Sequence, residues 1–165
     1  MIMQLFKKQK ELDFERSYPA PVATVWRAWT QSEMLRQWWG PEKTTVPECE
    51  IDPRVGGTIR VVTEAGAEMG KYAGTRWPMK GTFTVVAENE RLVYEARSWT
   101  EGDEEGSTIH HTNDLTLSEH DGITTVNLRI SITQIGPKAR MASFGMKWGY
   151  EQQLDHLGEL LAGEA

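Results

Sequence analysis

The pattern of polar and apolar residues changes twice in the first quarter of the chain. Residues 11–18 alternate polar and apolar side chains, which is typical of a half-buried strand. After Pro21, apolar residues recur at spacings of three and four up to about Thr30, so this segment is expected to form a short helix. A second such run follows Ser32 and stops at Gly40-Pro41. It predicts another short helix, capped by Ser32 and ended by the glycine and proline.

From about Thr44 the period becomes two, and turn residues divide the alternating segments. Among them, Asp121-Gly122 is a strong hairpin signal. We expect consecutive antiparallel strands at 46–51, 58–63, 81–86, 91–98, 109–117 and 124–133. The longest irregular stretch runs from Glu64 to Pro78.

After Gly136-Pro137 the pattern returns to a helical period. One face of the predicted helix carries Met146, Tyr150, Leu154, Leu157 and Leu161. The expected fold is therefore α+β, with a curved seven-stranded antiparallel sheet, a long C-terminal helix, and two short helices between the first and second strands. No internal repeat or linker divides the chain, so one domain is expected over residues 1–165.

Composition narrows the range of partners. The chain has 165 residues, 39% of them hydrophobic and 25% charged, as in ordinary soluble globular proteins. A net charge of −6 argues against nucleic acid or an anionic membrane surface as the partner. No segment approaches the roughly 20 apolar residues that span a bilayer. The single cysteine, Cys49, fits a reducing compartment, and we expect a cytoplasmic protein.

A long helix lying on a wide, curved sheet cannot contact every strand, so we expect a cavity between the two layers. Strand parity indicates which side chains face it. If Leu115 and Leu117 point inward, His111 and Asn113 on the same strand do so too. By the same rule the inward residues of the other strands are Ile59, Val61, Phe83, Val85, Leu92, Tyr94, Val126, Leu128, Ile130 and Ile132, unless a bulge reverses them.

This reasoning predicts a site for a small hydrophobic or aromatic molecule. Apolar area would supply the affinity, and a few polar groups would set the orientation of the ligand. The expected ligand-binding residues are Trp39, Phe83, Tyr94, His111, Asn113, Met146, Tyr150 and Leu154.

The sequence gives little evidence for a catalytic site or a metal site. His110 and His111 are adjacent in a strand and point to opposite faces, so they cannot ligate one ion together. A general-base role for His111 would require a partner within reach. Cys49 has no activating neighbour by spacing, and no serine lies in a nucleophile elbow. We expect neither a metal nor a cofactor, and no catalytic residue is assigned.

Several blocks of the chain resemble one family in order along nearly its whole length. They are residues 16–21 and 25–30, Trp38-Trp39-Gly40-Pro41, residues 52–58, 81–83, 91–94 and 149–157. The chain resembles the family named after the activator of the heat-shock protein 90 ATPase. This family lies within the START and birch-pollen-allergen-like (SRPBCC) superfamily, whose members adopt a helix-grip fold.

The resemblance implies a ligand-binding cavity and leaves other roles open. A chaperone-interacting role in the stress response is one alternative, although the namesake's separate chaperone-binding domain is absent from these 165 residues. A cyclase or hydrolase using the same cavity is another. The family usually has Trp where this chain has Tyr150, with Trp148 two residues earlier, and the loop 64–78 looks longer than usual. The oligomeric state is left open.

Overall fold

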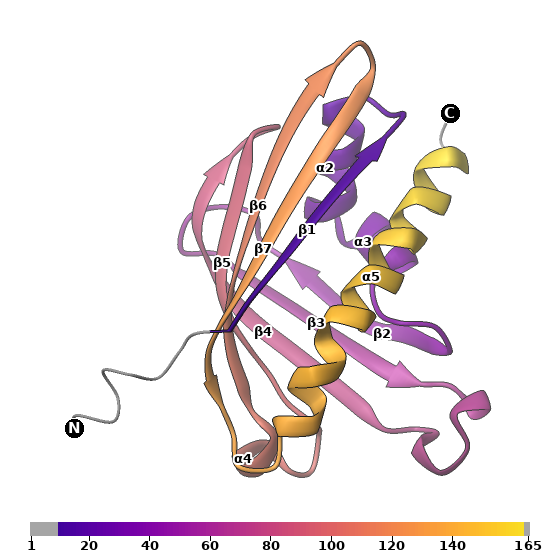
Figure 1. Cartoon of the computed structure of the whole chain (residues 1–165), viewed down its shortest axis with the longest axis vertical. Helices are drawn as coiled ribbons and strands as arrows, with labels where there is room; N and C mark the ends of the chain where they lie inside the picture. The colour runs from indigo at the N-terminus through magenta and orange to yellow at the C-terminus, as the bar shows by residue number, and fades with distance from the viewer. Residues whose placement is uncertain (1–9, 164–165) are drawn as a thin grey trace.

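The computed structural model describes residues 10–163 and has the expected α+β architecture (Figure 1). One antiparallel sheet has the strand order β1-β7-β6-β5-β4-β3-β2, so the strands from β2 to β7 follow one another in sequence and β1 is added beside β7. The strands are β1 (Lys10–Tyr18), β2 (Thr44–Ile51), β3 (Thr58–Ala65), β4 (Arg76–Ala87), β5 (Arg91–Ser98), β6 (Ile109–His120) and β7 (Ile123–Ile135).

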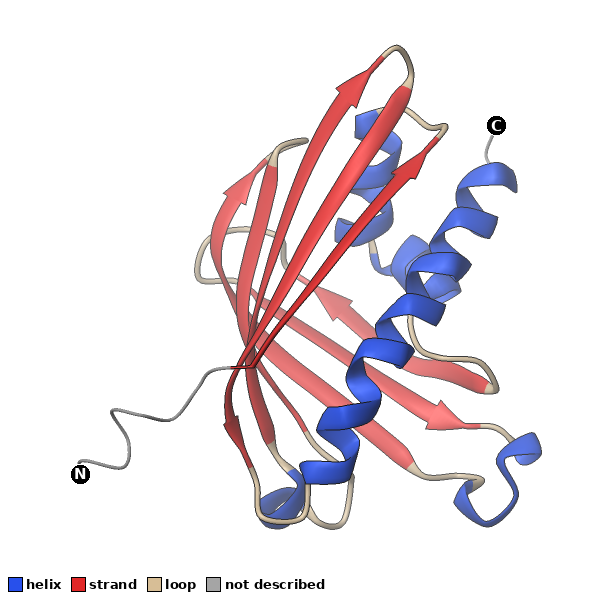
Figure 2. Ribbon diagram, in the orientation of Figure 1, coloured by secondary structure: helices blue, strands red, loops and turns tan. Residues whose placement is uncertain are grey.

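The helices lie on the concave side of this sheet (Figure 2). The long helix α5 (Arg140–Gly163) crosses it obliquely, and α2 (Val22–Thr30) and α3 (Ser32–Trp38) connect β1 to β2. Two short elements lie in loops: η1 (Ala67–Tyr72), which is 3-10 helix with a kink at Gly70, and the single turn α4 (Glu104–Ser107). The predicted fold class is thus confirmed.

Three local predictions are wrong. Glu64 and Ala65 extend β3 and Arg76 begins β4, so the predicted loop 64–78 shrinks to residues 66–75. Ser32 is the first residue of α3 rather than its cap, and the capping position is held by Gln31 without a side-chain hydrogen bond.

The third concerns Val85. Phe83 pairs with Tyr94 but Val85 pairs with Val93, because a bulge at Thr84 adds one residue to β4. Val85 therefore turns to the outer face, and Val86 packs against the core in its place.

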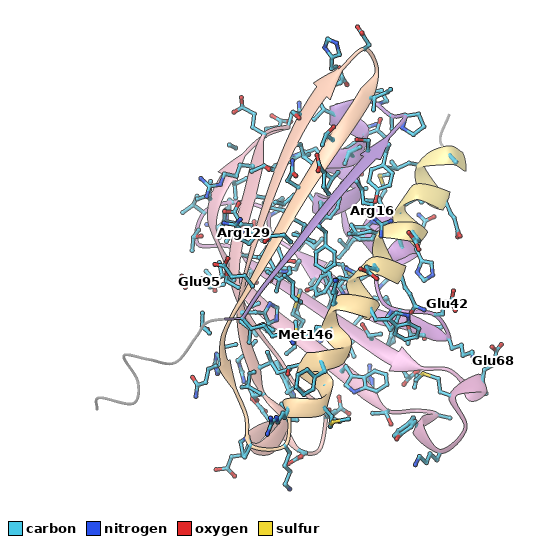
Figure 3. The ribbon with its side chains drawn as sticks, viewed as in Figure 1. Arg16, Glu42, Glu68, Glu95, Arg129 and Met146 are labelled. Atoms are coloured by element: carbon cyan, nitrogen blue, oxygen red, sulfur yellow. The ribbon has the colours of Figure 1, made fainter. Side chains whose placement is uncertain are left out.

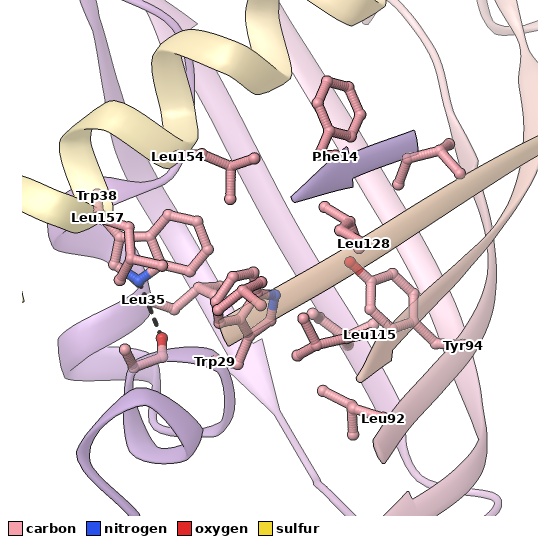
Figure 4. Close-up of a cluster of buried hydrophobic side chains, with 14 of the residues drawn as sticks. Phe14, Trp29, Leu35, Trp38, Leu92, Tyr94, Leu115, Leu128, Leu154 and Leu157 are labelled. Atoms are coloured by element: carbon pink, nitrogen blue, oxygen red, sulfur yellow. Dashed lines mark hydrogen bonds between the residues drawn. The ribbon is translucent and has the colours of Figure 1, made fainter. Parts of the chain in front are cut away.

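The core fills the space between the C-terminal half of α5, the short helices and the middle of the sheet (Figure 4). Trp29 and Trp38 meet edge to face with ring centroids 4.7 Å apart, and the Trp38 indole donates to the carbonyl of Ala28. Leu154, Leu157 and Leu161 of α5 are buried against this cluster. Large side chains therefore fill the interior between helices and sheet at this end of the molecule.

The N-terminal half of α5 is covered much less. Between Arg140 and Tyr150 only Ser143 is buried, whereas Met141, Phe144 and Trp148 are exposed. Figure 3 shows Met146 on the sheet side of this half, while Arg129 projects from the opposite face of the sheet. Within residues 10–163 no helix combines the length and apolar character needed to cross a membrane.

Candidate functional site

A groove of about 460 Å³ opens beneath the exposed half of α5, within the size range of sites for small organic molecules. Its walls come from α5, the adjoining ends of β3, β4, β5 and β6, and the loops at 39–41, 66–75 and 99–108. The aromatic and thioether side chains that line it are Trp39, Trp77, Trp99, Trp148, Tyr150, Met69, Met79 and Met146. Four of the seven tryptophans of the chain therefore gather around one hollow.

None of the side chains that line this groove carries a charge. Its polar members are hydroxyls and one amide, from Thr63, Ser98, Thr100, Ser107, Tyr150 and Gln153. A charged ligand would lose its hydration here without gaining a counterion, which is costly. The groove is thus suited to an uncharged molecule with broad apolar faces.

A chain of buried polar groups runs from the floor of the groove into the sheet. Ser98 Oγ lies 2.9 Å from Nε2 of His111, and Nδ1 of His111 lies 2.6 Å from the amide oxygen of Asn113. The amide nitrogen of Asn113 then donates to the hydroxyl oxygens of Tyr94 at 3.0 Å and Tyr150 at 3.1 Å. This hydrogen-bonded series ends at Ser98, Tyr94 and Tyr150, and of these three Ser98 and Tyr150 line the groove.

Burial keeps these groups uncharged. His111 is 2% exposed, and loss of hydration lowers the pKa of its imidazole, with the hydrogen bond to Asn113 acting in the opposite direction. Burial raises the pKa of Tyr150 to about 12, and that of Tyr94 also rises well above its usual value. At neutral pH the network therefore consists of a serine hydroxyl, a neutral imidazole, an amide and two phenols.

The loop Trp39-Gly40-Pro41 forms one end of the groove and is tied to α5. The backbone N–H of Gly40 donates to the buried side-chain oxygen of Gln153 at 2.8 Å. Gln152 accepts from the backbone of Glu42, and the ring of His156 lies 3.1 Å from the carbonyl of Gly40. Gly40 has φ of +91°, and a Cβ there would lie 2.7 Å from the Thr44 hydroxyl, so glycine is required.

The eight predicted ligand-binding residues fall into three groups. Trp39, Met146 and Tyr150 line the groove. His111 and Asn113 lie behind its wall and reach it only through Ser98 and Tyr150. Phe83, Tyr94 and Leu154 are almost fully buried and do not line it, because the short helices and the C-terminal half of α5 fill the space over them.

Sequence reasoning missed several residues of the groove. Ser98 shares its strand face with Tyr94 and Ala96, so the period of two already placed it inward. Trp77 lies in the stretch 64–78 that was expected to be a loop, and Met79 precedes the strand expected from residue 81, whereas both belong to β4. Gln153 gave no sequence signal, since its role depends on the position of Gly40.

Other reactive or charged features lie outside this groove. Cys49 is buried, and burial raises the pKa of its thiol to about 11. Among the described residues no three His, Cys, Asp or Glu side chains come together as metal ligands. A hollow of about 520 Å³ beside Arg36 and Lys43 also carries Glu42 and Glu159, so its charges are mixed. The groove under α5 combines apolar walls with converging polar groups, and we take it as the candidate site.

The model of one protein family matches residues 19–162, and its description is activator of Hsp90 ATPase homolog 1-like protein. The chain belongs to this family. The resemblance drawn from the sequence is thereby confirmed. A search of curated proteins finds no match.

Solved structures share the fold of this family member. A protein of Chromobacterium violaceum superposes with a TM-score of 0.74 at 22% identity, over 92% of this chain and 96% of its own. A Mycobacterium smegmatis protein gives a TM-score of 0.74 at 19% identity, over 94% and 96%. A Silicibacter pomeroyi protein that carries the family's name gives 0.70 at 23% identity, over 94% and 100%. At these identities the likeness concerns the fold alone.

Proposed function

We propose that the groove under α5 binds a small, uncharged, largely aromatic molecule. The observation that carries this proposal is the lining itself, which joins four indoles and three thioethers with no charged side chain. Burying apolar ligand surface contributes about 25 cal/mol per Å², and indole edges and faces favour planar aromatic partners.

Tyr150 supplies the main directional contact in this proposal. Its hydroxyl oxygen accepts from Asn113, so its own proton is free to donate to an acceptor on the ligand. Because the pKa of this phenol is raised to about 12, the proton is present throughout the neutral range. An aromatic molecule with a carbonyl or ether oxygen fits this arrangement.

Two fluorescent probes that differ by one charge test the proposal. N-Phenylnaphthylamine is neutral, and anilinonaphthalene sulfonate carries a sulfonate on the same rings. The neutral probe should bind at least about tenfold more tightly, because the sulfonate has no counterion in the groove. Equal affinities would contradict the proposed uncharged site.

Gly145 offers a way to fill the groove without disturbing the fold. It lines the groove from α5, and a Cβ at this position meets nothing within 4 Å. Gly145→Leu should stabilise the helix by a few tenths of a kcal/mol up to about 1 kcal/mol and still abolish probe binding. Gly145→Ala is the matched control and should keep most of the affinity. A Gly145→Leu protein that binds like the wild type would place the ligand elsewhere.

A second candidate function follows from the exposed face of α5. Met141, Phe144 and Trp148 are 80%, 60% and 64% exposed, and an apolar surface of this kind suits contact with another protein. The family description names activation of the Hsp90 ATPase. If this chain acts in that way, it should raise the ATPase rate of the purified chaperone, and Phe144→Ala should reduce the effect. An unchanged ATPase rate would contradict this second function and would not affect the ligand-binding proposal.

A further inference from the structure

Ser98, His111 and Asn113 form a hydrogen-bonded row in which a hydroxyl on the groove wall meets a buried imidazole. Ser98 is the last residue of β5 and pairs with Ile109 of β6, while His111 pairs with Ala96. Serine and histidine are therefore diagonal neighbours on the same face of adjacent strands, where side chains reach one another. The pairing of two central strands holds their oxygen and nitrogen 2.9 Å apart.

The amide of Asn113 determines which nitrogen of His111 carries the proton. Its NH₂ group is used by the two tyrosine oxygens, so its oxygen faces Nδ1 of His111 at 2.6 Å. An oxygen there accepts from an N–H, which holds the proton on Nδ1. The lone pair of Nε2 is then directed at Ser98, and the serine hydroxyl donates to it.

This arrangement contains a hydroxyl, a base that accepts its proton, and a third group that orients the base. Those three parts are what a nucleophilic hydroxyl needs. Ser98 also lines the groove, so a bound molecule reaches the hydroxyl. Neither Cys49 nor any exposed histidine of the described chain has such a set of neighbours.

We propose that Ser98 is a nucleophile activated by His111, and that the groove catalyses acyl transfer from neutral aromatic esters. The proposal rests on the proposed binding function for its substrate class, because the walls that accept an uncharged aromatic molecule would hold the ester. Asn113 is a positioning residue, since it acts through the ring of His111.

In the first step Ser98 Oγ attacks the carbonyl carbon of the ester while its proton moves to Nε2 of His111. The bond from that carbon to the leaving oxygen breaks, and the imidazolium returns the proton to this oxygen, so that an alcohol or phenol leaves. In the second step His111 takes a proton from water, the hydroxide formed attacks the acyl carbon, and the bond from that carbon to Ser98 Oγ breaks as the imidazolium returns its proton to Oγ. A free acid and the original serine result, with no other reactant required.

The alternative role of the row is structural, because a buried imidazole needs hydrogen-bond partners whether or not it reacts. Reaction with p-nitrophenyl butyrate distinguishes the two roles. Intact-protein mass spectrometry and peptide mapping should find a butyryl group on Ser98. Ser98→Ala and His111→Gln should each lower p-nitrophenol release by about 100-fold or more. Ser118→Ala, which removes an exposed serine of β6, should react like the wild type.

Two further measurements complete the test. Nitrogen NMR of His111 should show the proton on Nδ1, and Asn113→Asp should preserve that signature and the release of p-nitrophenol. Binding of N-phenylnaphthylamine to each variant, measured in parallel, shows whether the groove is intact. A Ser98→Ala protein that binds the probe and releases p-nitrophenol as fast as the wild type would overturn the nucleophile and leave the binding function in place. If the wild type itself does not bind N-phenylnaphthylamine, the proposed binding function is overturned instead.

Discussion

The side-chain nitrogen of Asn113 donates to the hydroxyl oxygen of Tyr150 across 3.1 Å, joining β6 to α5. The contact lies at the boundary between the buried and the exposed half of the helix. On one side Leu154 and Leu157 are enclosed by the core, and on the other the groove begins. The sheet thus fixes the helix at the residue that closes the deep end of the groove.

Two substitutions of Tyr150 distinguish the contribution of its ring from that of its hydroxyl. Tyr150→Phe should lower the free energy of unfolding by about 1 kcal/mol, because Asn113 loses one of the two oxygens that its NH₂ group reaches. The ring remains, so the affinity for N-phenylnaphthylamine should change little. The neutral naphthyl ketone prodan carries a carbonyl acceptor, and its affinity should fall by about five- to tenfold.

Tyr150→Ala completes this comparison. It removes the ring that packs against Phe14 and Trp39, so both probes should bind more weakly. The loss in the free energy of binding should exceed the loss in the free energy of unfolding. Equal losses for the two probes in Tyr150→Phe would show that Tyr150 contributes packing alone.

Gln153 and Gln152 are neighbours on α5 that accept from two backbone N–H groups of one loop. The bond from Gly40 to Gln153 is buried, whereas the bond from Glu42 to Gln152 is exposed. Gln153→Ala leaves a buried donor without an acceptor and should cost about 1–3 kcal/mol in urea unfolding. It should also weaken probe binding, because Trp39 and Gly40 line the groove.

Gln152→Ala is the matched control for this experiment. Water replaces the lost acceptor at an exposed site, so the cost should stay below about 0.5 kcal/mol. Similar costs for the two alanine variants would mean that the loop is held by contacts other than these two hydrogen bonds.

The order of strands and helices could be predicted because periodicity and turn residues recur throughout this chain. The strand 91–98 was predicted to the residue, since Glu95 and Arg97 alternate with Leu92, Tyr94 and Ala96. The face of Val85 could not be predicted, because the bulge at Thr84 appears only when β4 is paired with β5. Local pattern determines the element, and the partner strand determines the register.

The site was harder to predict than the fold for a similar reason. Parity places Tyr94, His111 and Asn113 inward, but inward positions belong either to a filled core or to a groove. Whether an inward position is filled core or groove wall depends on which parts of the sheet α2, α3 and α5 cover. Leu154 and Tyr150 share one helix stripe, yet only Tyr150 extends beyond the core.

Trp148 and Phe144 test whether the rim of the groove contributes to binding. Both are exposed on α5, at 64% and 60%, but only Trp148 lines the groove. Trp148→Ala should leave the free energy of unfolding within about 0.5 kcal/mol of the wild type. It should weaken N-phenylnaphthylamine binding by about tenfold, because a bound ligand would cover part of the indole.

Phe144→Ala is the control, and it should leave the affinity for the probe unchanged. A similar loss of affinity in both variants would indicate that the probe binds the exposed face of α5 instead of the groove. Phe144 packs against the ammonium group of Lys10, with 4.9 Å from Nζ to the ring centroid, an exposed contact of small energetic value.

Burial of His111 gives the fold a dependence on pH whose sign follows from proton binding. The unfolded chain protonates this imidazole near its ordinary pKa of 6.5, whereas in the fold loss of hydration lowers the pKa. The unfolded state therefore binds more protons below pH 6.5, and stability falls as the pH falls through this range toward the lower folded pKa. Between pH 7.5 and 5.5 the contribution of His111 amounts to at most about 1.4 kcal/mol.

His111→Gln removes the titrating group and should flatten the fall of stability between these two pH values, whatever its effect on stability at pH 7.5. His120→Gln is the control and should leave the wild-type slope unchanged, because His120 is the last residue of β6 and its side chain is almost fully exposed. Urea unfolding at both pH values gives the two slopes directly. An equal fall in the wild type and in His111→Gln would show that His111 takes up its proton equally well in the fold. The neutral ring assigned to the row from Ser98 to Asn113 would then be wrong, since Nε2 would no longer be free to accept a proton from the serine.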